Sequence, residues 1–184
     1  MYSSRTACNP PYTQYSRELR QYGWGEKYSV QRPYGFNSRL DPIQAAILSV
    51  KLPFLDEANE RRREIARRYN DIVLGLGLRP CHIINTSYAG HLYVVRHQLR
   101  DKLRIALSDM GIATDIHYPI LDCHQPGFSR LKWRALSLPN SEQSCNEILS
   151  LPIYPELLDS EVDTVCTALW DAARKINGSS WESE

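Results

Sequence analysis

Two polar residues in the first quarter of the chain have types and spacing that suit an anion. Asn37 and Arg39 lie two positions apart in the segment GFNSRL. Residues two apart on an extended segment point to the same side, so both side chains can reach one ligand. A guanidinium fork and a neutral amide donor together suit a phosphate. The alternative, which the local pattern alone favours, is that Asn37 shapes a turn while Arg39 pairs with a nearby carboxylate.

A second set of polar side chains lies around the segment IHYP. His117 offers hydrogen bonds from a neutral imidazole near pH 7, and Tyr118 offers a hydroxyl and a flat apolar ring. Two interpretations stay open: these residues line a ligand cleft, or His117 bonds a backbone carbonyl at a strand end while Tyr118 packs in the core. His124, in the segment CHQP, is either a ligand contact or, as we favour, part of a structural loop.

Acidic, imidazole and thiol side chains gather between positions 115 and 124, as they would around a metal ion. The members of this group are Asp115, His117, Asp122, Cys123 and His124. Their spacing matches no standard zinc pattern, and a proline separates the two halves. We therefore expect no metal site.

The charge of the chain is balanced, with 22 Lys plus Arg against 21 Asp plus Glu. Five arginines at 61–63 and 67–68 look like a nucleic-acid patch, but Glu57, Glu60 and Glu64 are interleaved at helical spacing. This pattern favours a solvated, ion-paired helix face. A net charge near zero gives no electrostatic attraction to nucleic acid or to an anionic membrane, and we expect neither as a partner.

Targeting signals and disulfide patterns are absent from the sequence. No apolar run is long enough to span a bilayer, and residues 1–14 lack the apolar core of a signal peptide. The cysteines at 8, 81, 123, 145 and 166 are odd in number and irregularly spaced. We expect buried or free thiols and a reducing, cytoplasmic location.

The elements that carry Asn37 and Arg39 are a loop and the helices after it. Residues 1–16 contain Pro10-Pro11 and are predicted to be an irregular leader, and 17–24 a short helix end followed by a loop to residue 40. Asp41 can cap a helix whose first residue is Pro42, and Pro53 bends or breaks it. A second helix is predicted over 54–74, with Ile65 and Tyr69 on its buried face.

The rest of the chain mixes strands with helices. Strands are predicted at 81–84, 92–96 and 112–116, with His91 and Tyr93 on one core-facing side of the second. Helices are predicted at 100–110, 130–136, 141–149 and from a cap at Asp159 to 176, with an extended piece at 151–154 and a disordered tail at 177–184. The fold class is therefore α+β: a small sheet covered by helices.

Four blocks in register resemble one family. They are RQYGW at 20–24, the segment from GFNSRLDP to RRYN at 35–70, HLYVVR at 91–96 with GIATDIHYP at 111–119, and ILSLPIYPELLDSEVD at 148–163. Together they resemble the C-terminal part of the DegT/DnrJ/EryC1/StrS aminotransferases, which use pyridoxal phosphate (PLP) to convert nucleotide-linked keto-sugars to amino-sugars. The resemblance implies the small C-terminal domain of the aspartate-aminotransferase (PLP fold type I) architecture, preceded by a long inter-domain helix.

The resemblance also implies roles for the candidate residues. Family members are dimers with composite active sites, so Asn37 and Arg39 would contact the phosphate of PLP bound in the partner subunit. His117 and Tyr118 would line the sugar side of the cleft, with His124 as a weaker substrate contact. The domains expected on this basis are a leader at 1–16, the edge of the large domain at 17–40, the inter-domain helices and small domain at 41–176, and the tail.

Transamination needs a lysine that holds PLP as a Schiff base. The lysines are at 27, 51, 102, 132 and 175, and none lies in a context like the family's lysine segment. We therefore expect that this polypeptide alone does not transaminate and that it is a fragment of a longer enzyme. The alternatives are one half of a split enzyme, and a non-catalytic module that binds nucleotide-sugars or pairs with an intact relative. The partner is then a second copy, an intact relative or an N-terminal family domain.

Overall fold

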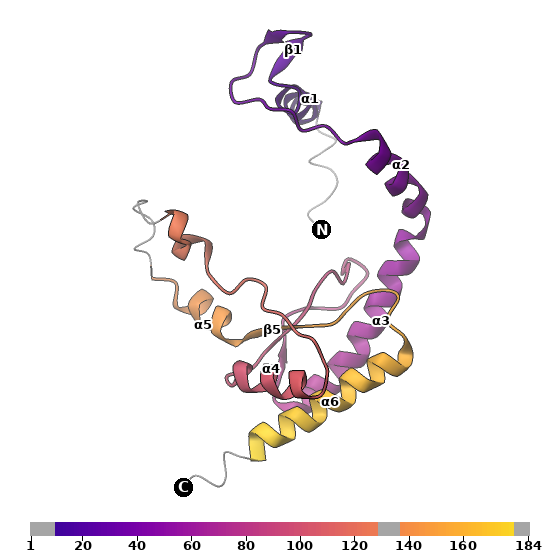
Figure 1. Cartoon of the computed structure of the whole chain (residues 1–184), viewed down its shortest axis with the longest axis vertical. Helices are drawn as coiled ribbons and strands as arrows, with labels where there is room; N and C mark the ends of the chain where they lie inside the picture. Colours follow the sequence, from indigo (N-terminus) through magenta and orange to yellow (C-terminus); the bar gives the residue numbers. More distant parts are fainter. Residues whose placement is uncertain (1–9, 129–136, 179–184) are drawn as a thin grey trace. The chain divides into compact units, whose positions relative to one another are not determined.

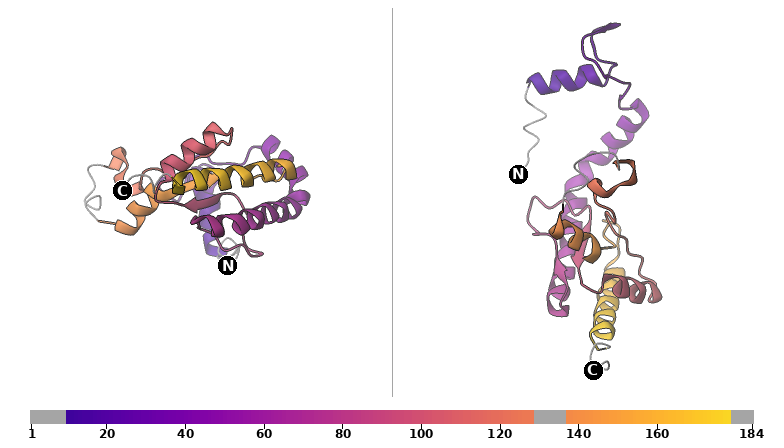
Figure 2. Two further views of the ribbon diagram at one scale, coloured as in Figure 1. Left: turned by 90° about the horizontal axis from the view of Figure 1, so that it is seen from below. Right: turned by 90° about the vertical axis from the view of Figure 1, so that its left-hand side faces the viewer.

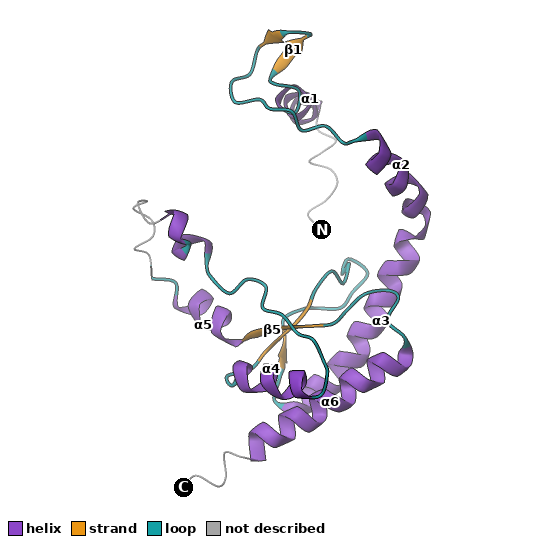
Figure 3. Ribbon diagram, in the orientation of Figure 1, coloured by secondary structure: helices purple, strands orange, loops and turns teal. Residues whose placement is uncertain are grey.

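A computed structural model describes residues 10–128 and 137–178 of the chain. The chain divides into two compact units, with the boundary between Leu55 and Asp56. Each unit has its own helices and its own small sheet (Figures 1 and 3). Within the described residues, no helix is both long enough and apolar enough to cross a membrane.

The first unit begins with a helix where we predicted an irregular leader. Helix α1 spans Pro10–Leu19, so the prediction for residues 1–16 is wrong over 10–16, and residues 1–9 lie outside the described part. The two prolines misled the prediction because proline is well tolerated in the first turn of a helix, where its missing N–H bonds nothing anyway. Strands β1 (Trp24–Glu26) and β2 (Ser29–Val30) then form a short antiparallel hairpin.

The helix start at Asp41 is confirmed. The Asp41 carboxylate accepts a hydrogen bond of 2.8 Å from the Ile43 backbone N–H, and Pro42 opens helix α2 (Pro42–Lys51). Proline at position 53 lies in a 3-10 turn, η1 (Leu52–Phe54), after which helix α3 (Leu55–Val73) begins. None of the α2 side chains is buried, although most of them are apolar.

The second unit is built around a three-stranded antiparallel sheet in the order β3 (Arg79–Pro80), β4 (Tyr93–Arg96), β5 (Ile148–Leu151). In the register of β4 and β5, Val94 lies opposite Ser150. Beyond β5, Asp115 makes a single bridge to Ser150. The predicted strands at 81–84 and 112–116 are wrong in extent. The first strand covers 79–80, and of 81–84 the Cys81 N–H alone is bonded to β4, at 3.0 Å from the Val94 carbonyl; of 112–116, Asp115 alone makes a bridge.

Three helices pack on one another beside this sheet: α3, α4 (Arg100–Asp109) and α6 (Asp159–Gly178). In Figures 1 and 2, α6 runs beside α3, and α4 packs on α6. The buried face of α3 includes Ile65 and Tyr69, as predicted, and α6 buries Val162 and Leu169. The helical spacing of these residues places them on one side of each helix, and these sides together form one apolar core.

The two remaining helical predictions differ from the structure. Helix α5 covers Pro139–Glu147 and gives way to β5, two residues earlier than predicted, since residues 148–151 pair with β4. The 3-10 turns η2 (Leu74–Leu76), η3 (Asp122–His124) and η4 (Pro126–Phe128) were not predicted. The helix predicted at 130–136 lies outside the described residues, as does the tail from 179, while α6 extends through 177 and 178.

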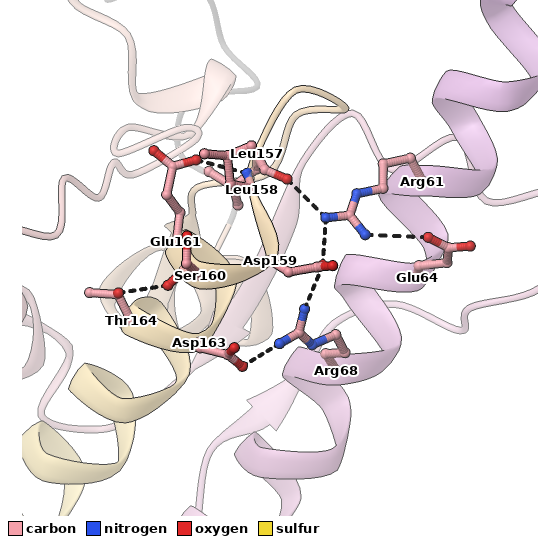
Figure 4. Close-up of polar contacts among 10 residues, drawn as sticks. All are labelled: Arg61, Glu64, Arg68, Leu157, Leu158, Asp159, Ser160, Glu161, Asp163 and Thr164. Carbon is pink, nitrogen blue, oxygen red and sulfur yellow. Dashed lines mark hydrogen bonds and ion pairs between the residues drawn. The ribbon is translucent and has the colours of Figure 1, made fainter.

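Ion pairs join α3 to α6 and involve two of the five arginines of the arginine-rich segment, Arg61 and Arg68 (Figure 4). Arg61 and Arg68 both donate to one oxygen of Asp159, at 2.8 and 2.9 Å, and Arg68 also pairs with Asp163. Hydrogen bonds from Arg61 lower the pKa of Asp159. Within α3, Glu60 pairs with Arg63 and Arg67, and Glu64 pairs with Arg61, so the ion-paired face is confirmed at these two glutamates.

The predicted cap of the last helix is wrong in its residue. Asp159 gives its carboxylate to α3, and Glu161 instead accepts a 2.8 Å hydrogen bond from the Leu158 backbone N–H. Charge-assisted hydrogen bonds from two guanidinium groups are stronger than one from a backbone N–H, so the Asp159 carboxylate binds the arginines of α3 rather than the first N–H groups of α6.

Candidate functional site

In the first unit, the loop that carries Asn37 and Arg39 is held against the end of α1. The Phe36 N–H donates to the Leu19 carbonyl at 3.0 Å, and the Ser38 N–H donates to the Arg20 carbonyl at 3.0 Å. Asn37 itself makes an antiparallel bridge with Gln21. The segment is therefore extended at Asn37, and the alternative in which Asn37 shapes a turn is wrong.

Two glycines allow this close approach. A Cβ on Gly35 would lie 2.0 Å from the backbone nitrogen of Gly23, and a Cβ on Gly23 would lie 1.9 Å from the Arg32 carbonyl oxygen. Gly23 also has a φ of +76°, which favours glycine. A side chain at either position would therefore force the segments around residues 22–23 and 32–35 apart.

Both predicted anion ligands are exposed at the surface of the first unit. Arg39 forms no ion pair with any residue in the described part of the chain, in contrast to the carboxylate partner that one interpretation gave it. It lines an open pocket of about 520 Å³ together with Gln14, Arg17, Glu18, Gln21, Trp24, Gly25, Glu26 and Lys27.

The charges around this pocket leave cations available. Glu18 is nearly buried and is bound by Arg32 at 2.8 Å and by Gln14 at 3.0 Å; these hydrogen bonds lower the pKa of Glu18. Its charge is thus compensated within the unit. The pocket wall then has three cationic side chains, Arg17, Lys27 and Arg39, and one uncompensated carboxylate, Glu26. This excess of positive charge lets the pocket accept an anion.

In the second unit, His117 lies at the edge of the sheet. Its Nδ1 atom is 3.0 Å from the Ser150 hydroxyl, and its Nε2 atom is 3.6 Å from a carboxylate oxygen of Asp115. The alternative that His117 bonds a backbone carbonyl is therefore wrong. The peptide bond between His117 and Tyr118 is cis. Tyr118 is 74% exposed, so the alternative that it packs in the core is also wrong.

Tyr118 lines a second open pocket, of about 420 Å³. The other residues of its wall are Ile120, Leu121, Asp122, Asn140, Ser141, Ser144, Cys145 and Ile148. We did not single out the α5 residues from the sequence. The polar residues at 140, 141 and 144 follow helical spacing, and that pattern is the signal that identifies this face.

His124 is not part of that wall. Its Nε2 atom is 3.9 Å from a Glu142 carboxylate oxygen on α5, which fits the structural-loop interpretation. His91 is exposed and lies outside β4, so its predicted core position is wrong. Tyr93 is fully buried, as predicted, and its hydroxyl donates a 2.6 Å hydrogen bond to Asn70.

The described residues contain no group of three or more side chains arranged to hold a metal ion. Cys81, Cys123, Cys145 and Cys166 are all free thiols. Of the described lysines, Lys27 is the one on the wall of the first pocket, where its amine lies 5.1 Å from the centre of the Tyr28 ring.

Comparison with known proteins identifies one family of aminotransferases. The model of the DegT/DnrJ/EryC1/StrS aminotransferase family matches residues 6–170. The dTDP-3-amino-3,6-dideoxy-alpha-D-galactopyranose transaminase of Aneurinibacillus thermoaerophilus is 41% identical over 152 residues, which are 82% of this chain and 41% of that protein. The dTDP-3-amino-3,4,6-trideoxy-alpha-D-glucose transaminase of Streptomyces venezuelae is 37% identical over 172 residues, 92% of this chain and 45% of that protein.

Solved structures agree with the sequence comparison. The crystal structure of DesV from S. venezuelae, in complex with a ketimine intermediate, superposes with a TM-score of 0.81 at 36% identity. The match covers 90% of this chain and 45% of DesV. The chain thus spans less than half the length of each of these relatives.

Proposed function

Because this chain belongs to the DegT/DnrJ/EryC1/StrS aminotransferase family, we propose that it supplies the C-terminal part of a PLP-dependent enzyme that converts a nucleotide-linked keto-sugar to an amino-sugar. It has the α+β fold of the small domain of the PLP fold type I architecture. The two relatives named above are, by name, transaminases of dTDP-linked amino-sugars. The free thiols agree with a cytoplasmic location, which is part of the same proposal.

The observation that carries the proposal is the exposed, extended Asn37–Arg39 segment. The donor set fits a cofactor phosphate: Arg39 lies on the pocket wall with a guanidinium fork that no carboxylate of the described residues binds, and Asn37 adds an amide two residues away. In the proposed homodimer, these two side chains bind the PLP phosphate of the partner subunit. PLP, when bound, supplies the electron sink that transamination requires.

The second unit contributes to substrate binding in this proposal. The exposed ring of Tyr118 and the imidazole of His117 face the sugar, while His124 stays near Glu142 as a secondary contact. A polypeptide of these 184 residues holds no lysine in the family's Schiff-base context. By itself it therefore neither binds PLP covalently nor turns over a keto-sugar.

A fusion tests the proposal directly. Residues 17–176 of this chain replace the matching part of the A. thermoaerophilus transaminase, and PLP occupancy is followed by absorbance alongside transaminase activity. We expect the fusion to bind PLP and to transaminate. Arg39→Ala should weaken PLP binding about 10- to 100-fold, because a hydrogen-bonded charge contributes about 1.5–3 kcal/mol, and Arg39→Lys should restore part of the loss.

The matched control is Arg20→Ala, which removes an exposed arginine from the same unit that is not part of the pocket wall. The control should bind PLP as the parent fusion does. Equal PLP binding by the Arg39→Ala and parent fusions would refute the phosphate role. In the 184-residue chain alone, a PLP adduct that borohydride reduces onto one lysine would refute the proposed inactivity.

A further inference from the structure

Ser150 is paired on both sides at the edge of the small sheet. It lies opposite Val94 in the β4–β5 ladder, and on its other side its N–H donates to the Asp115 carbonyl at 2.7 Å. The Asp115 N–H returns a 3.2 Å bond to the Ser150 carbonyl. Ser150 is only 5% exposed, and its hydroxyl lies 3.0 Å from Nδ1 of His117. A rigid, buried hydroxyl therefore orients the imidazole ring.

The surroundings of the ring decide which nitrogen carries the proton. An ionised carboxylate only accepts hydrogen bonds, and an oxygen of Asp115 is 3.6 Å from Nε2 of His117. A bare Nε2 lone pair would lie 3.6 Å from that negative oxygen, so we expect the neutral ring to carry its proton on Nε2. In that tautomer, Nδ1 accepts the hydroxyl proton of Ser150.

We propose that Asp115 and His117 together recognise one hydroxyl group of the sugar, and that Ser150 is the residue that positions His117 for this contact. The inference rests on the proposed function only in taking a sugar as the ligand. A hydroxyl both donates and accepts. The Nε2–H of His117 donates to its oxygen, and Asp115 accepts its hydrogen.

The geometry leaves room for such a ligand. Nε2 of His117 and the carboxylate oxygen of Asp115, 3.6 Å apart, are too far apart for a normal hydrogen bond to each other, but one hydroxyl oxygen can contact both from the solvent side, where Asp115 is 72% exposed. One oxygen of Asp115 is already bound by the Ile116 N–H at 2.7 Å, which leaves the other oxygen for the ligand. The exposed Tyr118 ring lies edge-on to His117, with centroids 6.1 Å apart, and offers a flat apolar surface to a sugar ring.

Nitrogen NMR of the histidine rings in the full chain tests the positioning role. Under mildly alkaline conditions we expect His117 to be almost wholly in the Nε2–H form. His97 is an internal reference, because its Nδ1 accepts the Leu99 N–H at 3.1 Å. Ser150→Ala and Asp115→Asn should each give a mixture of tautomers, and Asp115→Asn is an exposed change that leaves the fold intact. A ring protonated at Nδ1, or one unchanged in both variants, would overturn the proposal.

Titration of the same chain tests the ligand. Added dTDP-glucose should shift the His117 ring resonances, whereas dTDP, which lacks the sugar, should not. Asp115→Asn should weaken dTDP-glucose binding about tenfold, since a hydrogen bond to a charged group is lost. The control is Asp109→Asn, an exposed carboxylate at the end of α4. Equal shifts with dTDP, or unchanged affinity in Asp115→Asn, would overturn the assignment.

The fusion enzyme separates this inference from the proposed function. If the NMR results are as expected but the fusion does not transaminate, the proposed function is refuted and the hydroxyl contact is still supported. An active fusion in which Asp115→Asn and Ser150→Ala raise KM for the sugar more than they lower kcat supports both. An active fusion in which both variants keep the parent KM overturns the inference alone.

Discussion

Glu147 is the acceptor at the centre of a polar cluster that joins α5 to β4. One of its oxygens accepts from Arg96 twice, from Nη2 at 2.8 Å and from Nε at 3.0 Å, and from Arg79 at 3.4 Å. Its other oxygen accepts from Gln143 at 2.7 Å. The side chain of Glu147 is 6% exposed, that of Arg96 26% and that of Arg79 63%. The two arginines should therefore contribute very different amounts to stability.

The expected magnitudes follow from this exposure. Arg96→Ala leaves a nearly buried carboxylate without its closest cation. Breaking such a pair costs about 3–5 kcal/mol, which partial exposure of Arg96 reduces to about 2–3 kcal/mol. Arg79→Ala removes one long contact in water and should cost less than about 0.5 kcal/mol. Urea unfolding followed by circular dichroism measures both free energies of unfolding, with the slope against urea checked for constancy.

The pH dependence supplies a second test of the same cluster. The hydrogen bond from Gln143, followed by that from Arg96, lowers the pKa of Glu147 below its ordinary value of 4.5, against the opposing effect of burial. The ionised side chain therefore stabilises the fold above that value, and the contribution is lost as pH falls through the lowered pKa. Glu147→Gln should be less stable than the parent at pH 7, and the difference should shrink on acidification. Equal losses in Arg96→Ala and Arg79→Ala, or a pH-independent difference for Glu147→Gln, would refute the reasoning.

Two further predictions concern the core of the second unit. Leu169→Ala leaves a cavity at a fully buried position on α6 and should lower the free energy of unfolding, measured in urea, by about 3 kcal/mol. Leu158→Ala, at a 62% exposed position, should lower it by less than about 0.5 kcal/mol. Equal losses of stability would contradict the assigned core. Tyr93→Phe removes the donor to Asn70 and should cost about 1–2 kcal/mol, with a double-mutant cycle including Asn70→Ala to isolate the bond; a coupling energy near zero would show that the bond contributes nothing.

Local signals in the sequence predict much of the helical structure. The Asp41–Pro42 start is visible because the cap and the first-turn proline act within a few residues. Gly111, with a φ of +78°, ends the helix at 100–110 for the same kind of reason. The buried positions Ile65 and Leu169 follow from helical periodicity alone, since a helix can bury only one face.

The strands and the ends of α5 were predicted less well. Residues 148 and 149 were assigned to the helix before them, and they belong to strand β5 because β4 offers a partner. His91 was predicted to be buried by strand alternation, but β4 begins only at Tyr93, so the alternation does not extend to it. Strand limits depend on pairing with distant segments, which a single sequence does not display.

The sequence alone determined the helices α2, α3, α4 and α6, the buried faces of α3, α4 and α6, the α+β class and the family, because these depend on local patterns and on blocks in a fixed order. It also identified Asn37, Arg39, His117 and Tyr118 as the residues with suitable chemistry. Only the tertiary structure decided what surrounds them. Ser150 lies 33 positions from His117, and Asp159 lies 91 positions from Arg68, and the folded core brings each pair within hydrogen-bond distance. Contacts between residues so far apart depend on how the elements pack, and no local pattern of residue types encodes that packing.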